Sequence, residues 1–513
     1  MIPPLAVIFA WPLAGIAFFR SMPLPVAVCW CIVAGYLFLP TQVAFDLPIL
    51  PSIDKNSVPS LVALVAILVL AGKTKVQDGA VVLRGWLPAS PILLLLCLGL
   101  LASAALTVLS NPDPLPIGGG VVLPGLRTYD AFAAVLSGII ELLPFLIARR
   151  LLGHPEQHRN LLRILCLAGL IYSVPILFEV RFSPQLNQMI YGFFPHSWIQ
   201  HIRGGHYRPL VFLEHGLWLA IFMAGTALAA FTMFRIGMPG SRGKYLAAGL
   251  WLVLILYLCR SLGSLVIGLL FISVLLLMKP RLQVVFAACL VGVIMLYPLL
   301  RGAGLIPVER VNNLAASISD ERSRSLQFRL LNEERLLEKA NQRPVFGWGG
   351  WGRSLLYGED ASLSSTTDGF WVIAIGRDGW VGYLCRFGLL GIPIIILAIR
   401  RRRYALRPET AGICLILTAN MVDLIPNASL TQITWLLAGA LAGRLELTGR
   451  EVEAGQAGED PEQGRREVRY SRFGHDRPTA YRLHRSLEGP EQAAEPPAQE
   501  EDVRGRDGVR RHR

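Results

Sequence analysis

Long apolar runs separated by short basic clusters constrain this chain more than any other feature of its sequence. Runs such as 91–109, 210–234 and 282–300 are long enough to cross, or nearly cross, the ~30 Å hydrocarbon layer of a bilayer. Every backbone amide in lipid needs an internal partner, and no barrel-like alternation is visible, so these runs must be helices. With 53% hydrophobic residues in 513, the chain is predicted to be an all-α polytopic integral membrane protein.

Basic residues predict which helix ends face the cytoplasm. They follow every second apolar run, as the positive-inside rule requires, and include Arg149, Arg150, Lys279, Arg281 and the run 400–403. The count is about 12 to 13 transmembrane helices. The two values correspond to two readings of 4–19 and 25–39, which could be two spans or a re-entrant pair. The first run has no basic flank or cleavage site, so we expect it to be a retained helix.

Four regions follow from this pattern. Residues 1–300 hold the N-terminal transmembrane helices, 301–369 form one large polar loop, and 370–443 hold the C-terminal transmembrane helices. Residues 444–513 are rich in Arg, Glu, Gln, Pro and Gly and poor in aliphatic residues, which predicts a disordered tail. The same counting of basic clusters places this tail, and hence the C-terminus, in the cytoplasm and the large loop on the opposite face.

The polar loop, which we call the roof, carries a predicted amphipathic helix over 319–341. Its apolar residues recur at helical spacings, and Pro344 follows its end. The apolar positions are Leu326, Leu330, Leu331, Leu337 and Ala340. A glycine–tryptophan run then covers 347–352, without the Lys-Ser/Thr ending of a phosphate loop, and we expect it to form a tight turn over sugars. Its tryptophans, Trp348 among them, could instead belong to an interfacial belt.

Arginines on the predicted outer face are candidates for binding an anionic substrate. A guanidinium at a helix end can bind phosphate oxygens through two parallel hydrogen bonds, which suits a diphosphate leaving group. The candidates are Arg203, Arg208, Arg260, Arg329 and Arg353. The alternative for each is an interfacial anchor whose stem packs on apolar surface.

Four residues on the same face are candidates for a general base. The imidazoles of His206 and His215 titrate near neutrality, although each histidine could equally cap a helix or pack. Glu214 and Asp368 are alternatives, because a carboxylate that enters lipid has its pKa raised by desolvation. The residues alone do not decide among them.

Several other classes of chemistry are not supported by the sequence. The formal charge of +13 is spread over topology-determining clusters, and no aromatic–basic nucleic-acid module accompanies it. All eight cysteines lie inside apolar stretches without metal-ligand spacing, so we expect buried thiols. We therefore expect no metal, no cofactor and no nucleic-acid partner.

At these residues the chain resembles the O-antigen ligase and O-antigen polymerase superfamily of bacterial surface-glycan enzymes. Residues 208–216 resemble the family's arginine-led helix entry, and 259–264 resemble its serine–arginine turn. Arg329 and the sequence RPVFGWG at 343–349 resemble the end of its large periplasmic loop. Residues 368–382 resemble its His-Asn block, except that Asp368 stands where the ligases have histidine.

The resemblance implies metal-independent glycosyl transfer on the periplasmic face of the bacterial inner membrane. The donor would be an undecaprenyl diphosphate-linked glycan, and the acceptor a glycan or a lipid. Other polysaccharide export proteins are possible partners, besides the membrane lipid itself. The absent histidine favours a polymerase of exopolysaccharide or O-antigen over a lipopolysaccharide ligase. The alternative from a different class is a polytopic permease or flippase, in which the arginines would line a path.

Overall fold

The computed structural model describes residues 1–47, 50–70, 83, 85–195, 197–203, 205–237, 240–305, 313, 316–317, 320–365, 368–402, 404 and 406–458. The chain divides into two units, Met1–Glu453 and Ala454–Arg513. Apart from the end of the last helix, the description below concerns the first unit.

Helices dominate the first unit. The long ones are α1 (Pro4–Ser21), α2 (Leu24–Phe38), α3 (Val58–Leu70), α4 (Pro91–Leu109), α5 (Thr128–Leu151), α6 (Pro155–Phe182), α8 (Gly216–Ile236), α9 (Arg242–Leu258), α10 (Leu262–Leu277), α11 (Pro280–Gly302), α13 (Asp320–Asn341), α14 (Phe370–Ile399), α15 (Pro408–Asp423) and α16 (Gln432–Gly458). Among the described residues, seven of these helices are long and apolar enough to cross a membrane: α1, α4, α5, α6, α8, α11 and α14. The predicted all-α membrane protein is thereby confirmed. The runs at 4–19 and 25–39 form two separate helices, α1 and α2.

Proline fixes where many of these helices begin. It occupies the first or second position of α1, α2, α4, α6, α11 and α15. The first backbone N–H groups of a helix have no internal partner, so a residue without an N–H loses nothing there. The same side chain disfavours a helical conformation in the residue before it, which separates each helix from the preceding one.

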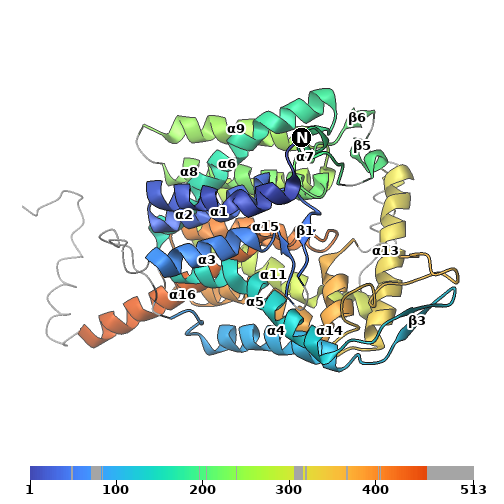
Figure 1. Ribbon diagram of the computed structural model, residues 1–513. Coiled ribbons are helices and arrows are strands. Elements are labelled where there is room, and N and C mark those ends of the chain that lie inside the picture. The colour runs from blue at the N-terminus through green and yellow to red at the C-terminus, as the bar shows by residue number, and fades with distance from the viewer. Residues whose placement is uncertain are drawn as a thin grey trace, which may run out of the picture. The chain divides into compact units, whose positions relative to one another are not determined.

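The helices run between two ends of the bundle, which we call the loop end and the basic end (Figure 1). The loop end carries β1–β6 and α13. At the basic end Arg149 and Glu446 form a buried ion pair, Arg159 pairs with Glu409, and the N–H of Leu83 donates to the carbonyl of Arg150. Segments far apart in sequence therefore meet at the basic end.

Small elements that the sequence did not predict cover the loop end. They are three antiparallel hairpins, a short helix and a 3-10 turn. Their bounds are β1 (Ala44–Phe45) with β2 (Ile53–Asp54), β3 (Leu115–Gly118) with β4 (Val121–Leu123), β5 (Ile202–Arg203) with β6 (His206–Tyr207), α7 (Leu186–Tyr191) and η1 (Trp198–His201). Strands this short give no periodic signal, because their pairing depends on distant packing.

The roof helix α13 matches its prediction at the C-terminal end, Asn341, whereas Ser319 lies outside the described residues. Its buried apolar positions are Leu336, Leu337 and Ala340. Leu331, which the helical spacing assigned to the apolar face, is 50% exposed, so that assignment was wrong. The face of α13 that is buried is the one that contacts α14, and it is rotated about the helix axis relative to the predicted apolar face.

Helix α14 begins at Phe370, where the predicted C-terminal transmembrane region begins. It is broken at Gly379, whose φ is 69°. The turn after α13 fills this break: the N–H groups of Trp348 and Gly349 donate to the carbonyls of Gly376 and Arg377, and the N–H of Trp380 donates to the carbonyl of Pro344. A Cβ at Gly379 would overlap the carbonyl of Val345, so this close approach requires glycine.

Two further expectations are corrected. Helix α16 continues to Gly458, so the predicted boundary at Arg444 falls inside a helix, and only 459–513 of the predicted tail lies outside the described residues. Cys289 is exposed on α11, whereas the other seven cysteines are buried as expected.

Candidate functional site

Arg208 and Arg260 meet at the loop end. Arg208, just before α8, is 7% exposed, and its Nη2 donates to the backbone carbonyl of Arg260, 3.0 Å away. Gly216 allows this, because a Cβ there would lie 2.5 Å from Cγ and Cδ of Arg208. Arg260 has a φ of 53°, and its guanidinium lies 5.8 Å from the ring centre of Tyr257. The two predicted anion-binding arginines are thus neighbours.

The two predicted histidines lie in different surroundings. His215 is the N-cap of α8, where its Nδ1 accepts a hydrogen bond from the N–H of Leu217 at 3.0 Å, and its ring lies 5.2 Å from that of His201. His206 is exposed on β6, opposite Arg203 in the hairpin. The capping alternative therefore describes His215, and within the described residues no contact links His206 to Arg208 or Arg260. For Arg203 the structure describes the backbone only, so the position of its predicted anion-binding side chain lies outside the description.

Glu214 has a partner that sequence reasoning missed, Lys55. Lys55 is 5% exposed, its Nζ donates to the carbonyl of Phe212 at 2.7 Å and lies 5.5 Å from the ring centre of Tyr36. Burial lowers the pKa of Lys55 to about 7, although Glu214 and Asp54 oppose the shift. Burial raises the pKa of the Glu214 carboxyl, Lys55 and a hydrogen bond with Thr41 lower it, and Asp54 raises it. The only feature of the sequence that could have identified Lys55 was its position as a single lysine beside an apolar run.

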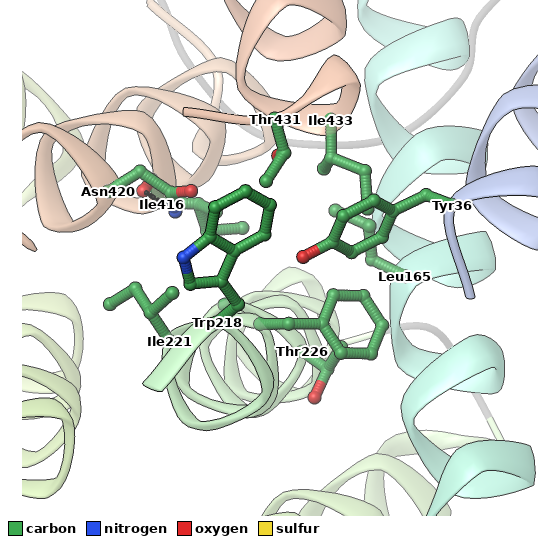
Figure 2. Close-up of a pocket in the computed structure, with 11 residues that line it drawn as sticks. Tyr36, Leu165, Trp218, Ile221, Thr226, Ile416, Asn420, Thr431 and Ile433 are labelled. Carbon is green, nitrogen blue, oxygen red and sulfur yellow. Dashed lines mark hydrogen bonds between the residues drawn. The ribbon is translucent and has the colours of Figure 1, made fainter. Parts of the chain in front are cut away.

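A narrow cavity lies on the other side of Tyr36. Its lining includes Tyr36, Trp218, Asn420 and Thr431, and it leaves about 20 Å³ of space. Figure 2 shows the Tyr36 hydroxyl directed across it toward Trp218. Space of this size holds about one water molecule. It is therefore too small for a sugar.

Asp368 forms an ion pair with the roof. Its Oδ2 lies 3.4 Å from Nε of Arg329, and Nη1 of Arg329 donates to the carbonyl of Pro426 at 3.3 Å. Burial raises the pKa of Asp368, and Arg329 opposes that shift. The structure brings these two predicted residues together, and each satisfies part of the other's charge.

A second carboxyl in the roof, Glu333, was not among the predicted residues. It is 5% exposed and lies against Tyr297, Trp371 and Arg301. Burial raises the pKa of Glu333 to about 7, while Arg301 and Trp371 act in the opposite direction. One feature of the sequence could have identified Glu333. It lies on the face of α13 that also carries Leu336 and Leu337, and an acidic residue is unusual on an apolar face.

Arg353 and Trp348 hold the turn that follows α13. Arg353 is 1% exposed and donates to three backbone carbonyls, those of Trp348, Pro124 and Asp113, at 3.3, 2.9 and 2.9 Å. The Trp348 indole donates to the carbonyl of Lys339 at 2.8 Å, and the Arg343 guanidinium lies 4.7 Å from its ring centre. These contacts are structural. Trp351, by contrast, is 64% exposed.

A polar groove lies between α5 and α14. A cavity of about 410 Å³ and another of about 190 Å³ share the lining residues Ser137, Glu141 and Arg377. Arg386 spans the groove: its Nε and Nη2 contact the two Glu141 carboxylate oxygens at 2.9 and 3.1 Å, and its Nη1 pairs with Asp378. Charged residues inside apolar runs were the available signal, and the sequence reading passed over them.

Across the described parts of the chain, no group of three or more His, Cys, Asp or Glu side chains could hold a metal ion. Comparison with protein-family models, with curated proteins and with solved structures finds no match for this chain.

Proposed function

We propose that this protein is a membrane glycosyltransferase that lengthens a bacterial surface polysaccharide. It would move a glycan from an undecaprenyl diphosphate-linked donor to a hydroxyl group of a second glycan. One observation carries the proposal: Arg208 and Arg260 are neighbours at the loop end, with the half-buried carboxyl of Glu214 close by in the chain, above a bundle of apolar helices. This combination offers cations for a diphosphate, a base for a hydroxyl and a lipid-facing surface for the polyprenyl chain.

The proposal includes a topology. The helices α1–α6, α8–α11 and α14–α16 would cross the inner membrane, within the ~12 to 13 spans expected from the sequence. The loop end and the roof would face the periplasm. The basic end and the C-terminus would face the cytoplasm, which is supported by Arg149, Arg159, Arg235 and Arg400 near that end.

In the proposed reaction, Arg208 and Arg260 bind the diphosphate and the Glu214 carboxylate removes the proton of the acceptor hydroxyl. The acceptor oxygen forms a bond to the anomeric carbon of the donor, and the bond from that carbon to the diphosphate oxygen breaks. The leaving diphosphate takes the electron pair, and its growing negative charge is what fixed cations stabilise most. A raised pKa strengthens Glu214 as a base, because basicity increases with the pKa of the conjugate acid.

Lys55 would set the strength of that base. Its positive charge lowers the pKa of Glu214, and its own pKa near 7 means that this charge is present below neutral pH and absent above it. Asp368, with Arg329 as its partner, would organise the roof over the acceptor. His215 would fix the start of α8 and hence the position of Glu214.

A strain that lacks the protein tests the proposal through its glycan intermediates. A polymerase predicts single lipid-linked repeats on the periplasmic face and loss of long polysaccharide. Long lipid-linked chains that are never joined to lipid A would identify a ligase instead. Accumulation of repeats on the cytoplasmic face would contradict glycosyl transfer and indicate a flippase.

A further inference from the structure

The groove between α5 and α14 has a polar lining that the reaction above does not use. Its larger part extends from Glu141 and Arg377 to Asp54 and Asn56 in the segment before α3, and to Gln432 at the start of α16. Its smaller part extends to Gly349, Gly350 and Trp351 in the turn above α14. The groove therefore begins at the loop end and reaches down the side of α5.

The segment before α3 separates this groove from the proposed reaction centre. Asp54 and Asn56 line the groove, whereas Lys55 between them donates to Phe212 and acts on Glu214. The Gln432 side chain holds this segment in place, because its Nε2 donates hydrogen bonds to the backbone carbonyls of Lys55 and Asn56. This segment would thus separate a ligand in the groove from the proposed base.

Gln432 has an acceptor atom that no described residue uses. Its side chain is 7% exposed and lines the groove, and its Oε1 receives no hydrogen bond within the described chain. The two bonds from Nε2 fix the orientation of the amide, so Oε1 is the free atom. The atom itself is buried, so a ligand with a hydroxyl or amine donor would satisfy it only by displacing the side chains that cover it.

The charges of the groove favour a neutral ligand. Glu141 and Asp378 are compensated by Arg386 and Arg377, and the remaining charge is the carboxylate of Asp54. An anionic ligand such as a diphosphate would be repelled by this remaining carboxylate. A sugar offers many hydroxyl donors, and the exposed Trp351 at the mouth offers an apolar face for a ring.

We propose that this groove binds the glycan acceptor, as a chain of neutral sugars that runs from Trp351 past Ser137 toward Asn56. That the bound glycan is the acceptor rests on the proposed function. That the groove binds a polyhydroxylated ligand rests on the residues that line it. The groove would hold the growing chain up to the segment 54–56, and the terminal sugar would extend past that segment to bring a hydroxyl to Glu214.

A bulky side chain at Ser137 tests the groove. Ser137 lines both cavities, and its hydroxyl donates to the carbonyl of Ala133 at 2.8 Å. Ser273 on α10 is a matched control, because it is also exposed and its hydroxyl donates to the carbonyl of Leu269 at 2.9 Å. The probe is a lipid-free oligosaccharide of two to three repeats, released from the surface polysaccharide of the source bacterium and titrated into purified protein in nanodiscs.

Ser137→Trp should weaken binding by at least about tenfold, Trp351→Ala should weaken it less, and Ser273→Trp should bind like the wild type. Equal binding by Ser137→Trp and the wild type, or no binding by the wild type, overturns the groove. A parallel assay of donor consumption separates the two proposals. If Ser137→Trp consumes donor and elongates chains normally, the groove proposal is refuted and glycosyl transfer is not. If the wild type binds the oligosaccharide, Ser137→Trp does not, and no donor is consumed, glycosyl transfer is refuted and the groove is not.

Discussion

The Nη2 atom of Arg208 lies 3.0 Å from the backbone carbonyl oxygen of Arg260 and donates a hydrogen bond to it. The bond joins the segment before α8 to the turn between α9 and α10, and it uses the backbone of Arg260 and not its guanidinium. The two arginines therefore differ: Arg208 both positions the turn and offers charge, whereas Arg260 offers charge alone.

Replacing either arginine by alanine should nearly abolish polymer formation. Loss of one charge-assisted contact to the leaving diphosphate is expected to cost about 2–4 kcal/mol, or ~30- to 1000-fold in rate. Lysine should rescue poorly, because a point charge does not reproduce the planar guanidinium. Polymer length and initial rate in reconstituted vesicles are the measurements. Arg20→Ala, at the exposed end of α1, is the control, and equal loss in all three variants would show that the arginines are membrane anchors.

The pH dependence of the rate should report Glu214. Because the proposed base acts deprotonated and its pKa is raised, the rate should fall as the pH drops through a value above the ordinary range of glutamate. Lys55→Met removes a charge that lowers this pKa, so the acid limb should move to higher pH. Lys339→Met is the matched control, since its Nζ also donates to a backbone carbonyl, that of Leu355. An acid limb that stays in place in Lys55→Met would exclude Glu214 as the base.

Glu333 should make the protein less stable at alkaline pH. Its folded pKa of about 7 lies above the unfolded value, so the folded state holds the proton between about pH 4.5 and 7 and stability falls as the pH rises through that window. The shift corresponds to about 3 kcal/mol. Glu333→Gln should therefore raise the melting temperature at pH 8 and change it little at pH 4. The control is the adjacent Glu334→Gln, because the Glu334 side chain is 58% exposed. It should leave the melting temperature nearly unchanged at both pH values.

Truncation should separate the end of α16 from the rest of the tail. A chain that ends at Gly458 keeps Glu446, the partner of the fully buried Arg149, and should retain activity. A chain that ends at Arg444 leaves the Arg149 guanidinium buried without that partner, at a cost of about 3–5 kcal/mol, and should accumulate poorly in the membrane. Glu446→Gln in the full chain should reproduce part of that loss. Normal accumulation of the shorter chain would show that the ion pair is dispensable.

Cysteine labelling tests the sidedness of the roof. Ser362→Cys places a thiol on an exposed part of the roof, and we expect an impermeant thiol reagent to label it in intact spheroplasts. Cys289 should first be replaced by alanine, because it is exposed. Arg402→Cys at the basic end should be labelled only after lysis. The reverse pattern would invert the topology and with it the face on which the proposed reaction occurs.

The sequence was informative where the membrane imposes the rule. Apolar runs predicted most helices, and basic clusters predicted that Arg208 and Arg260 share an end of the bundle. It failed where a role depends on a distant partner. Lys55 gains its surroundings from Phe212 and Glu214, and nothing local distinguishes Trp348, which packs under Arg343, from Trp351, which faces outward.

The insertion of the turn after α13 into the break at Gly379 would restrict how the substrates of the proposed reaction arrive. Lifting this part of the roof would expose the amide groups that the break in α14 leaves without helical partners, so it cannot swing aside as a hinged cover would. We therefore expect the donor to enter sideways, by diffusing within the plane of the bilayer and passing between helices. Turnover should then depend on the surface density of the donor in the membrane and on the fluidity of the surrounding lipid, and not on its bulk concentration.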